Sequence, residues 1–500
     1  MTSAEFKERG SEVIDFIAAY WQTIQSRPVQ SQVNPGDILE LLPTSPPQFP
    51  DFPQDLAAEL ERVIMPGITH WQSPNFFGYF PANASGPSVL GELLSAGLGV
   101  QGMLWLTSPA CTELETRVMD WLAQMLGLAP EFHSTHTGGG TGGGVIQSTA
   151  SDAALVALVA ARHRARTALK KLNTSPTPSF TLYTSSQAHS SIIKSAMVAG
   201  LADGPLDSTH LRLIDVDRAG RMRPDLLQQA IIQDLSKGKL PIFVAATVGT
   251  TGTTAIDPIP EIAKLLRSTA SQAALPSSLL PWLHIDAAHA GAAAICPEFR
   301  PLLAGVEHCD SFCFNAHKWL LTNFDCDCFV VRDRRTLTDA LSITPEYLRN
   351  RPSDSGEVFD YRDWQIPLGR RFRALKLWLV IRHYGVNGLQ AHIREHIRLA
   401  RLFESLIAAD ERFEIVAPCT LNLICFRLKD SPKGDLNKIL LDSLNSGGKL
   451  FLTHTSLPAS MGGHKCILRV AIGATFTAES HVRAAWTHIE NTASKLLASN

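Results

Sequence analysis

The feature that most constrains the fold is a series of short apolar segments in the middle of the chain, several of them separated by helical patterns. The strand-like segments are residues 180–183, 211–214, 242–247, 282–286 and 329–331. Helical periodicity occupies residues 153–169, 224–235 and 260–266. Short apolar strands alternating with helices are typical of an α/β fold, in which helices cover both faces of a mostly parallel sheet. Ligands of such sheets bind at the carboxyl ends of the strands.

The regions on either side of this series have a different character. Residues 4–27 and 53–65 have helical periodicity, and a proline-rich connector covers residues 43–50. Because these elements have little core of their own, residues 1–85 are expected to be a helical segment that packs across a second subunit. Residues 86–375 are predicted to form the large domain. A long helix and later strands predict a small α+β domain over residues 376–500.

The composition excludes several classes of protein. The chain has 500 residues, of which 45% are hydrophobic and 18% charged, and its formal net charge is −2. Lysine and arginine are spread along the chain, so no surface for nucleic acid or an anionic membrane is expected. The N-terminus lacks the apolar core of a signal peptide, and no stretch of about 18 apolar residues could span a bilayer. The nine cysteines are scattered without zinc-site spacing, which predicts reduced thiols in a cytoplasmic protein without a metal site.

One lysine, Lys318, indicates chemistry. It follows His317 inside an apolar stretch, and Asp286 closes the strand-like segment upstream. Most lysines are solvated surface charges, but a lysine and an aspartate in this arrangement suit an enzyme that uses pyridoxal 5′-phosphate (PLP). The lysine amine bonds to the cofactor aldehyde, and the aspartate pairs with the pyridine nitrogen and keeps it protonated.

A glycine-rich run at residues 138–144 precedes the small and hydroxyl residues of the stretch 147–152. Glycines let the backbone approach an anion, and the first amides of a following helix can hold a phosphate. The alternative is a flexible loop whose Ser or Thr caps the helix. Beside Lys318 and Asp286 we favour the phosphate cradle. The run is not a P-loop, because no Gly-Lys-Ser/Thr follows, and it fails as a dinucleotide fingerprint.

Short motifs in order along nearly the whole chain resemble those of the group II PLP-dependent amino acid decarboxylases, specifically the aromatic-L-amino-acid decarboxylase branch. They include Phe77-Gly78-Tyr79-Phe80-Pro81, Ala188-His189-Ser190-Ser191, Gly249-Thr250-Thr251, His284-Ile285-Asp286-Ala287-Ala288, Asn315-Ala316-His317-Lys318-Trp319 and residues 364–373. The resemblance implies a type I, aspartate aminotransferase-like PLP fold. It also implies an obligate homodimer with active sites at the interface.

The resemblance also assigns roles to single residues. Lys318 matches the lysine that binds the cofactor, Asp286 the partner of the pyridine nitrogen, and His189 the histidine stacked on the ring. Tyr347, in a polar stretch typical of a mobile lid, matches the tyrosine that protonates the substrate carbon after carbon dioxide leaves. Relatives with phenylalanine there tend to be oxidative aldehyde synthases. The cofactor-binding positions that it implies are Thr149, Ala150, Ser151, His189, Thr251, Asp286, Ala288, Asn315, His317 and Lys318.

Six further positions match the substrate pocket: Trp71, Phe80, Ala82, Gln101, Met103 and Gly369. Gln101 and Met103 match the part of the pocket that the partner chain supplies. In relatives, a glycine at position 369 goes with room for an indole or catechol.

The chain departs from the family pattern at several of its positions. Ala82 lacks the hydroxyl of the threonine common in animal dopa enzymes, and Gln101 and Met103 replace more apolar residues. Ala316 and His289 also depart from the pattern, which leaves the cofactor chemistry intact. We therefore expect a decarboxylase that favours L-tryptophan, with tyrosine, phenylalanine, dopa and 5-hydroxytryptophan open. An oxidative aldehyde synthase and a catalytically silent scaffold on the same fold are the alternatives.

Overall fold

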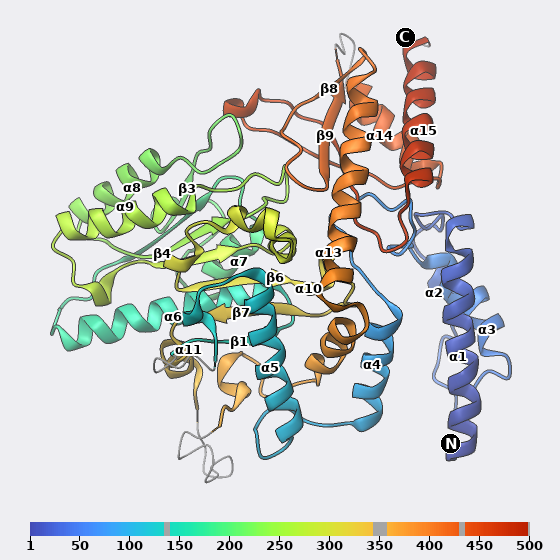
Figure 1. Ribbon diagram of the computed structural model, residues 1–500, viewed down its shortest axis with the longest axis horizontal. Coiled ribbons are helices and arrows are strands. Elements are labelled where there is room, and N and C mark those ends of the chain that lie inside the picture. Colours follow the sequence, from blue (N-terminus) through green and yellow to red (C-terminus); the bar gives the residue numbers. More distant parts are fainter. Residues whose placement is uncertain (135–140, 344–357, 430–435, 499–500) are drawn as a thin grey trace.

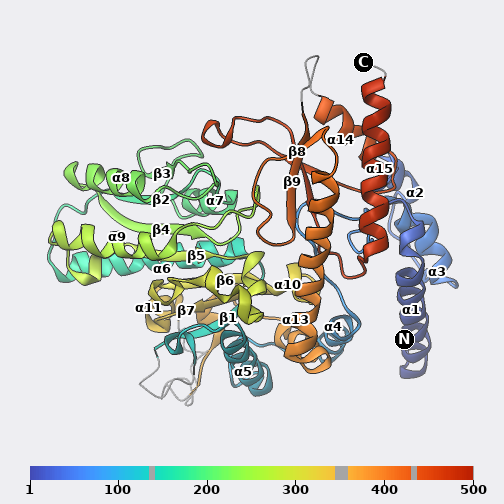
Figure 2. The same ribbon diagram turned by 45° about the horizontal axis from the view of Figure 1, so that its top comes forward.

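The computed structural model describes residues 1–134, 141–343, 358–429 and 436–498. An N-terminal segment, a central sheet and a smaller C-terminal sheet follow one another along the chain (Figure 1). The N-terminal segment holds α1 (Ser3–Thr23), α2 (Asp37–Leu41) and α3 (Leu56–Glu59). It lies on the far side of α13 (Arg373–Ala408) from the central sheet (Figures 1 and 2). No residue of α1 is buried, so this helix contributes almost nothing to a core within its own chain.

The central sheet has seven strands in the order β1-β7-β6-β5-β4-β2-β3. Its pairings are parallel from β6 through to β3, and only β7 runs against its neighbours. This confirms the predicted mostly parallel sheet. The strands are β1 (Gly143–Gln147), β2 (Phe180–Ser185), β3 (Leu211–Ile214), β4 (Leu240–Thr247), β5 (Trp282–Asp286), β6 (Ser311–Asn315) and β7 (Asp327–Val331).

Helices cover both faces of this sheet, as predicted. Successive strand residues point to opposite faces, so Val244 of β4 belongs to one core and Phe243 to the other. One core contains side chains of α5 (Pro109–Leu126), α8 (Pro224–Ser236) and α9 (Ile259–Gln272). The other contains side chains of α6 (Ala150–Lys171), α7 (Ser190–Val198) and α11 (Arg334–Leu341).

The structure corrects the interpretation of the glycine run. Gly143 and Gly144 lie inside the buried strand β1, and neither lines the cavity described below. A side-chain carbon at Gly144 would lie 2.6 Å from Met119, so packing against α5 explains this glycine. Residues 138–140 lie outside the described residues.

The C-terminal region is the predicted small α+β unit. Its antiparallel sheet has the order β10-β11-β9-β8, and α13, α14 and α15 contribute side chains to its core. The bounds are α13 (Arg373–Ala408), β8 (Phe413–Ile415), β9 (Leu423–Leu428), α14 (Leu436–Ser446), β10 (Thr453–Thr455), β11 (Ile467–Ala471) and α15 (Glu479–Ala498). Gly385 interrupts α13 with φ 61° and ψ 174°. Among the described residues, no helix is long and apolar enough to cross a membrane.

Candidate active site

The carboxyl ends of four parallel strands surround a cavity of about 220 Å³. β2, β4, β5 and β6 each contribute residues at or just after their last position, as expected for a ligand site on such a sheet. The cavity is lined by all ten residues that the sequence assigns to the cofactor: Thr149, Ala150, Ser151, His189, Thr251, Asp286, Ala288, Asn315, His317 and Lys318.

Lys318 lies on α10 (Ala316–Trp319), a single turn that follows β6 directly. Burial lowers the pKa of its amine, and the nearby carboxylate of Asp286 opposes that effect. Asp286 closes β5, and one of its oxygens accepts a hydrogen bond of 3.0 Å from the backbone N–H of Ala288. The sheet therefore brings a depressed-pKa amine and a fixed carboxylate to one cavity, which is the arrangement expected of a nucleophile and an electrostatic partner.

The first turn of α6 forms another wall of the cavity. Asp152 caps this helix by accepting hydrogen bonds of 3.1 and 3.0 Å from the backbone N–H and hydroxyl of Thr149. Ala150 and Ser151 occupy the first helical positions, where backbone N–H groups have no partner within the helix. The cap, the helix dipole and the hydroxyl groups together make this wall suitable for a phosphate.

Two histidines in the cavity are held in the neutral form. The Nδ1 atom of His317 accepts a hydrogen bond of 2.9 Å from the backbone N–H of Cys326, and burial lowers the pKa of His317 to about 3. His189 caps α7, where its Nδ1 accepts from the backbone N–H of Ser191 at 3.2 Å. Burial lowers the pKa of His189 as well, with Asp286 opposing the shift and Lys318 adding to it. Neutral imidazoles can stack and accept protons without adding charge to the cavity.

A second, more apolar cavity of about 460 Å³ opens beside the first. Both share Phe80, His189, Thr251, His317, Lys318 and Phe324. The second adds Trp71, Tyr79, Pro81 and Ala82. The rings of Trp71 and Tyr79 are stacked, with centroids 5.4 Å apart and an interplanar angle of 12°. Three of the six predicted substrate-binding residues, Trp71, Phe80 and Ala82, therefore lie beside Lys318.

The other three predicted substrate-binding residues do not line either cavity in their own chain. Gln101 and Gly369 are neighbours, because a side-chain carbon at Gly369 would lie 3.2 Å from the Gln101 amide. The Gln101 side chain also accepts a hydrogen bond of 2.9 Å from the backbone N–H of Arg370. Met103 accepts one of 3.1 Å from Arg362 through its backbone oxygen. Tyr347, the predicted proton donor, lies outside the described residues.

The structure adds lining residues that were not predicted: Thr247, Gly249, His289 and Phe324. Gly249 has φ +84°, and a side-chain carbon there would lie 2.5 Å from Ala290, so the turn after β4 requires glycine. In the sequence, only the motif Gly249-Thr250-Thr251 indicates that this position matters. His289 is stacked between Phe80 and Trp319, at centroid distances of 3.8 and 4.9 Å.

Arg469 of β11 joins the C-terminal sheet to both cavities. Its guanidinium donates to the backbone oxygens of Thr251 at 2.6 Å, Gly252 at 3.1 Å and Tyr79 at 3.3 Å, and it lies 5.5 Å from the ring centroid of Phe80. It is 3% exposed, and burial lowers its pKa. An arginine inside an otherwise apolar strand was the available signal in the sequence, since such a side chain needs internal partners.

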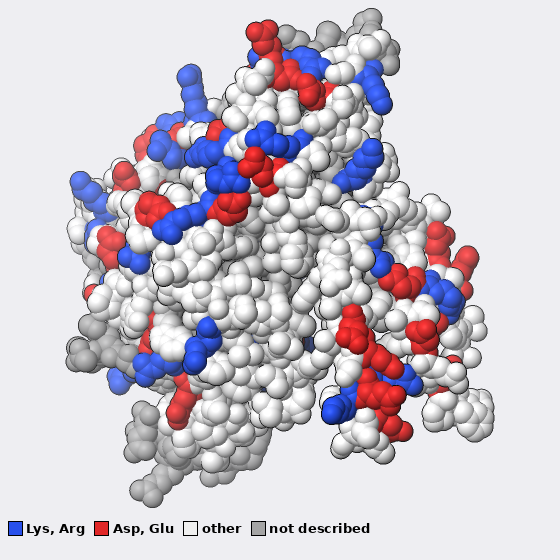
Figure 3. Space-filling model, turned by 45° about the vertical axis from the view of Figure 1, so that its right-hand side comes forward, with Lys and Arg blue, Asp and Glu red and all other residues white. Residues whose placement is uncertain are grey.

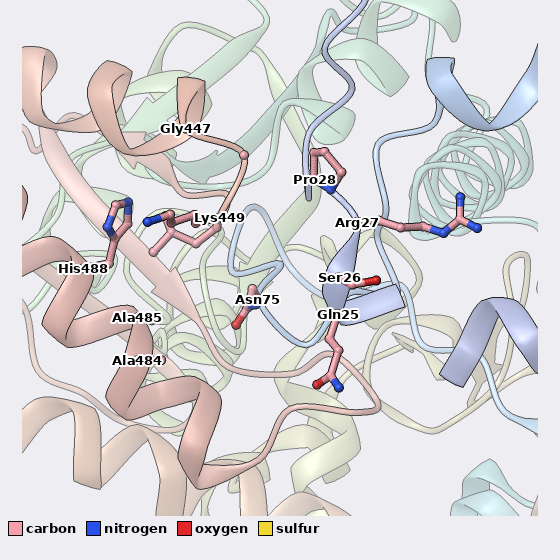
Figure 4. A pocket seen from close by; sticks show the side chains of 12 residues that line it. Gln25, Ser26, Arg27, Pro28, Asn75, Gly447, Lys449, Ala484, Ala485 and His488 are labelled. Atoms are coloured by element: carbon pink, nitrogen blue, oxygen red, sulfur yellow. The ribbon is translucent and has the colours of Figure 1, made fainter. Parts of the chain in front are cut away.

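A separate cavity of about 400 Å³ lies between the N-terminal segment and the C-terminal helices (Figure 4). Lys449 and His488 lie on one side of it, while the Arg27 side chain points away from them. Arg27 is paired with Glu61 at 2.5 Å. None of the described residues that line this cavity is acidic, so its lysine lacks the partner that Lys318 has. The chemistry therefore favours the cavities around Lys318.

Comparison with known proteins identifies the family to which this chain is similar. The model of the "Pyridoxal-dependent decarboxylase conserved domain" matches residues 35–429. Tryptophan decarboxylase 2 of Oryza sativa subsp. japonica is 46% identical, over 99% of this chain and 96% of that protein. Phenylacetaldehyde synthase of Arabidopsis thaliana is also 46% identical, over 99% and 97%. The crystal structure of Oryza sativa TDC with PLP and tryptamine has a TM-score of 0.91 at 39% identity, and 99% of each chain is covered.

Proposed function

The chain belongs to the pyridoxal-dependent decarboxylase family, and from this premise we propose that it converts L-tryptophan to tryptamine and carbon dioxide. The cofactor, the carboxy-lyase class and the predicted type I PLP-dependent fold rest on the family match and on the decarboxylases that it resembles. The preferred amino acid is the proposed part. The observation that carries it is the apolar, aromatic cavity beside Lys318, which has no acidic residue in its described lining.

The residues around the first cavity fit PLP. The α6 N-terminus, Ser151 and Asn315 would hold the phosphate, since they offer N–H and hydroxyl donors to an anion. Asp286 would accept a hydrogen bond from the pyridine nitrogen, and Lys318 would bind the aldehyde. When bound, PLP takes up the electron pair that remains on the substrate α-carbon as carbon dioxide leaves.

The protein's own groups then have distinct tasks. The lowered pKa of Lys318 increases the fraction of its amine that is neutral, which favours its action as a nucleophile and as a proton carrier at Nζ. The carboxylate of Asp286 favours the protonated form of the ring that it contacts. His189 would stack over the ring. Tyr347 would donate its phenolic proton to the substrate α-carbon in place of the lost carboxylate.

An indole suits the second cavity on physical grounds. Trp71, Phe80 and Phe324 offer ring faces and edges, against which a bicyclic aromatic side chain can pack. Ala82 offers no hydroxyl, so a catechol bound near it would leave a polar group without this partner, which is costly when buried. Tyrosine, phenylalanine and dopa are the alternatives within the same reaction.

Formation of an aromatic acetaldehyde is the second candidate function, because a phenylacetaldehyde synthase is as similar to the chain as a tryptophan decarboxylase. We favour amine formation because position 347 is tyrosine. The test is to incubate the holoenzyme with equimolar tryptophan, tyrosine, phenylalanine and dopa and to quantify amines, aldehydes and hydrogen peroxide. Tryptamine should dominate. A dominant tyramine would overturn the substrate, and stoichiometric aldehyde and peroxide would overturn the reaction.

We further propose a homodimer in which the partner supplies Gln101 and Met103 to the second cavity. Four leucines of α4 (Gly86–Leu98) are about half exposed or more: Leu90, Leu93, Leu94 and Leu98. Exposed apolar side chains nearby are Leu106, Ile366 and Leu368. A broad face beside the N-terminal segment carries few charged side chains (Figure 3). Apolar surfaces of this kind support association, and residues 1–85 would pack across the partner.

Sedimentation of Leu94→Arg tests this dimer. The variant should sediment as a monomer and lose turnover, because a monomer lacks the pocket residues that the partner would supply. The matched control is Leu206→Arg, a leucine that is 88% exposed on a distant loop. A dimeric Leu94→Arg or a monomeric wild-type protein would contradict the arrangement.

We also propose that the large and small domains span residues 86–375 and 376–500. A cytoplasmic location is proposed as well, because eight of the nine cysteines are buried free thiols.

A further inference from the structure

Asp327 is a buried carboxyl group that the proposed reaction does not use. It opens β7, it is 0% exposed, and neither of its carboxyl oxygens has a hydrogen-bond partner among the described residues. An ionised carboxylate without hydrogen bonds is strongly disfavoured in such an environment. Burial without hydrogen bonds therefore favours the neutral form of this carboxyl group.

The charges around Asp327 favour the neutral acid. Six titratable groups act on it or are affected by it: Asp152 of α6, Asp286 of β5, Cys313 of β6, Lys318 of α10, Cys328 of β7, and Cys326, which precedes β7. Burial raises the pKa of Asp327 well above its usual range, the carboxylate of Asp286 raises it further, and the amine of Lys318 only partly opposes this. Burial and the neighbouring carboxylate therefore both favour the protonated form of this carboxyl group.

The register of the sheet places Asp327 directly opposite Asn315 on β6 and opposite Gln147 on β1. Side chains of opposite residues in an antiparallel pair lie on the same face, with their β-carbons about 4.5–5.5 Å apart. Gln147 already donates its amide N–H to the backbone oxygen of Trp364 at 2.7 Å. Asn315 lines the cofactor cavity, and its Oδ1 atom is buried without a partner.

Three buried oxygens without partners, the two of Asp327 and Oδ1 of Asn315, thus belong to facing residues. All three are acceptors if Asp327 is ionised, whereas a neutral carboxyl group has one O–H donor to offer. We propose that Asp327 is a positioning residue, which as a neutral acid donates its O–H to Oδ1 of Asn315 and so turns the Asn315 amide N–H groups toward the phosphate of the cofactor.

The protonation state decides which end of the amide faces the cavity. An ionised Asp327 would accept from the Asn315 N–H groups and turn Oδ1 toward the phosphate, where two acceptors would repel each other. A neutral Asp327 does the opposite, and the phosphate then meets a donor. The inference rests on the proposed role of Asn315 at the phosphate, and it is independent of which amino acid the enzyme decarboxylates.

Infrared spectra of the apo-protein test the protonation directly. The difference spectrum between wild type and Asp327→Asn at pH 7 should contain the carbonyl band of one neutral carboxylic acid. A difference spectrum with carboxylate bands alone would overturn the proposal.

The affinity of the apo-protein for PLP, measured by fluorescence titration without substrate, tests the hydrogen bond. Asp327→Asn keeps an N–H donor and should bind PLP within about threefold of wild type, whereas Asp327→Leu should bind about tenfold more weakly. As pH rises through the pKa of Asp327, the wild-type affinity should fall relative to that of Asp327→Asn. Equal affinities of the leucine variant and wild type, or equal losses in both variants, would overturn the proposal.

Two controls separate this role from others. Asp234→Asn removes a buried aspartate that is paired with Arg212 far from the cavity, so it should lower the unfolding temperature and leave PLP affinity unchanged. Asn315→Ala should weaken PLP binding, and unchanged binding would overturn the role of Asn315 and this inference together. If Asp327→Leu does not fold, the infrared band and the pH profile still decide. If the wild-type enzyme proves not to decarboxylate tryptophan, all these expected results still hold, because none of them involves the substrate.

Discussion

The floor and the mouth of the active site are built in different ways. The floor, which is the cavity of about 220 Å³, consists of strand ends and helix starts of one sheet, and it carries Lys318, Asp286 and the phosphate wall. The mouth, which is the cavity of about 460 Å³, is formed by the segment 71–82 and Phe324, and Arg469 of the C-terminal sheet holds it in place. The difference teaches that the chemistry is fixed by one folding unit, whereas selectivity depends on contacts between units.

The largest expected effect separates floor from mouth by turnover. Lys318→Ala should lower kcat by at least about four orders of magnitude, because it removes the group that we propose binds the cofactor and carries the proton. Trp71→Ala, at the mouth, should lower kcat/KM by about 10- to 100-fold, since it removes packing only. Steady-state kinetics with saturating PLP measure both. Comparable losses in the two variants would break the distinction.

The floor should also be the acid-sensitive part of the fold. His284, on the strand β5 that ends in the floor residue Asp286, is fully buried, and burial lowers its pKa to about 4. In the unfolded chain it takes up a proton near pH 6.5, but in the folded protein only near pH 4, so stability falls as pH falls through this window. For one such histidine the loss approaches about 1.4 kcal/mol per pH unit.

Urea denaturation of the apo-protein between pH 7 and pH 4.5 measures this loss. His284→Gln should show a shallower decline than wild type, because glutamine does not titrate. His454→Gln alters an exposed histidine of the C-terminal sheet and should follow the wild-type curve. Parallel curves for wild type and His284→Gln would show that the floor histidine is not the source.

Arg469→Met tests the contact between the C-terminal sheet and the mouth of the active site. The substitution leaves the backbone oxygens of Thr251 and Tyr79 without their donor, which should cost about 1–3 kcal/mol of stability. Because the chemical groups of the floor remain, we expect KM to rise about tenfold while kcat changes much less. Arg427→Met, on the neighbouring strand β9 and paired with Glu414, is the control. A fall in kcat with unchanged KM would place Arg469 with the floor.

The smallest effect concerns one hydroxyl group at the mouth. Ala82→Thr should shift the ratio of kcat/KM for dopa over tryptophan by about five- to tenfold toward dopa, because it adds a partner for the catechol. Ala82→Val adds the same volume without the hydroxyl, so it separates hydrogen bonding from space. If both variants shift the ratio equally, the hydroxyl argument fails.

The sequence predicted the floor far better than the mouth. Asp286 and Thr251 lie at or just after a strand that the sequence pattern predicted. Lys318 was added by its motif alone, because the strand that precedes it, β6, was not predicted. The predicted α/β fold is confirmed because the alternating strand and helix patterns on which it rests are local. β1 was missed, because Gly143 and Gly144 resemble loop residues, and their place in a strand depends on Met119 and Trp364 packing against them.

The contacts of the mouth could not be read locally. Arg469 and Tyr79 are almost 400 positions apart in the sequence, and no periodicity relates them. Asp327 likewise looks like an ordinary polar residue until the register of β7 places it opposite Asn315. Buried polar groups in strands were the available signal, but their partners become identifiable only once the sheet order is known.

Asn83 has a consequence for how the protein is made. It donates to the backbone oxygen of Gly473 at 2.7 Å, accepts from Leu321 and follows the mouth segment directly. These contacts span up to 390 positions. At a translation rate of roughly 5–20 residues per second, the segment waits about 20–80 seconds on the ribosome for its partners. Until Gly473 has emerged, Asn83 cannot form the hydrogen bond that ties the mouth segment to the residues after β11.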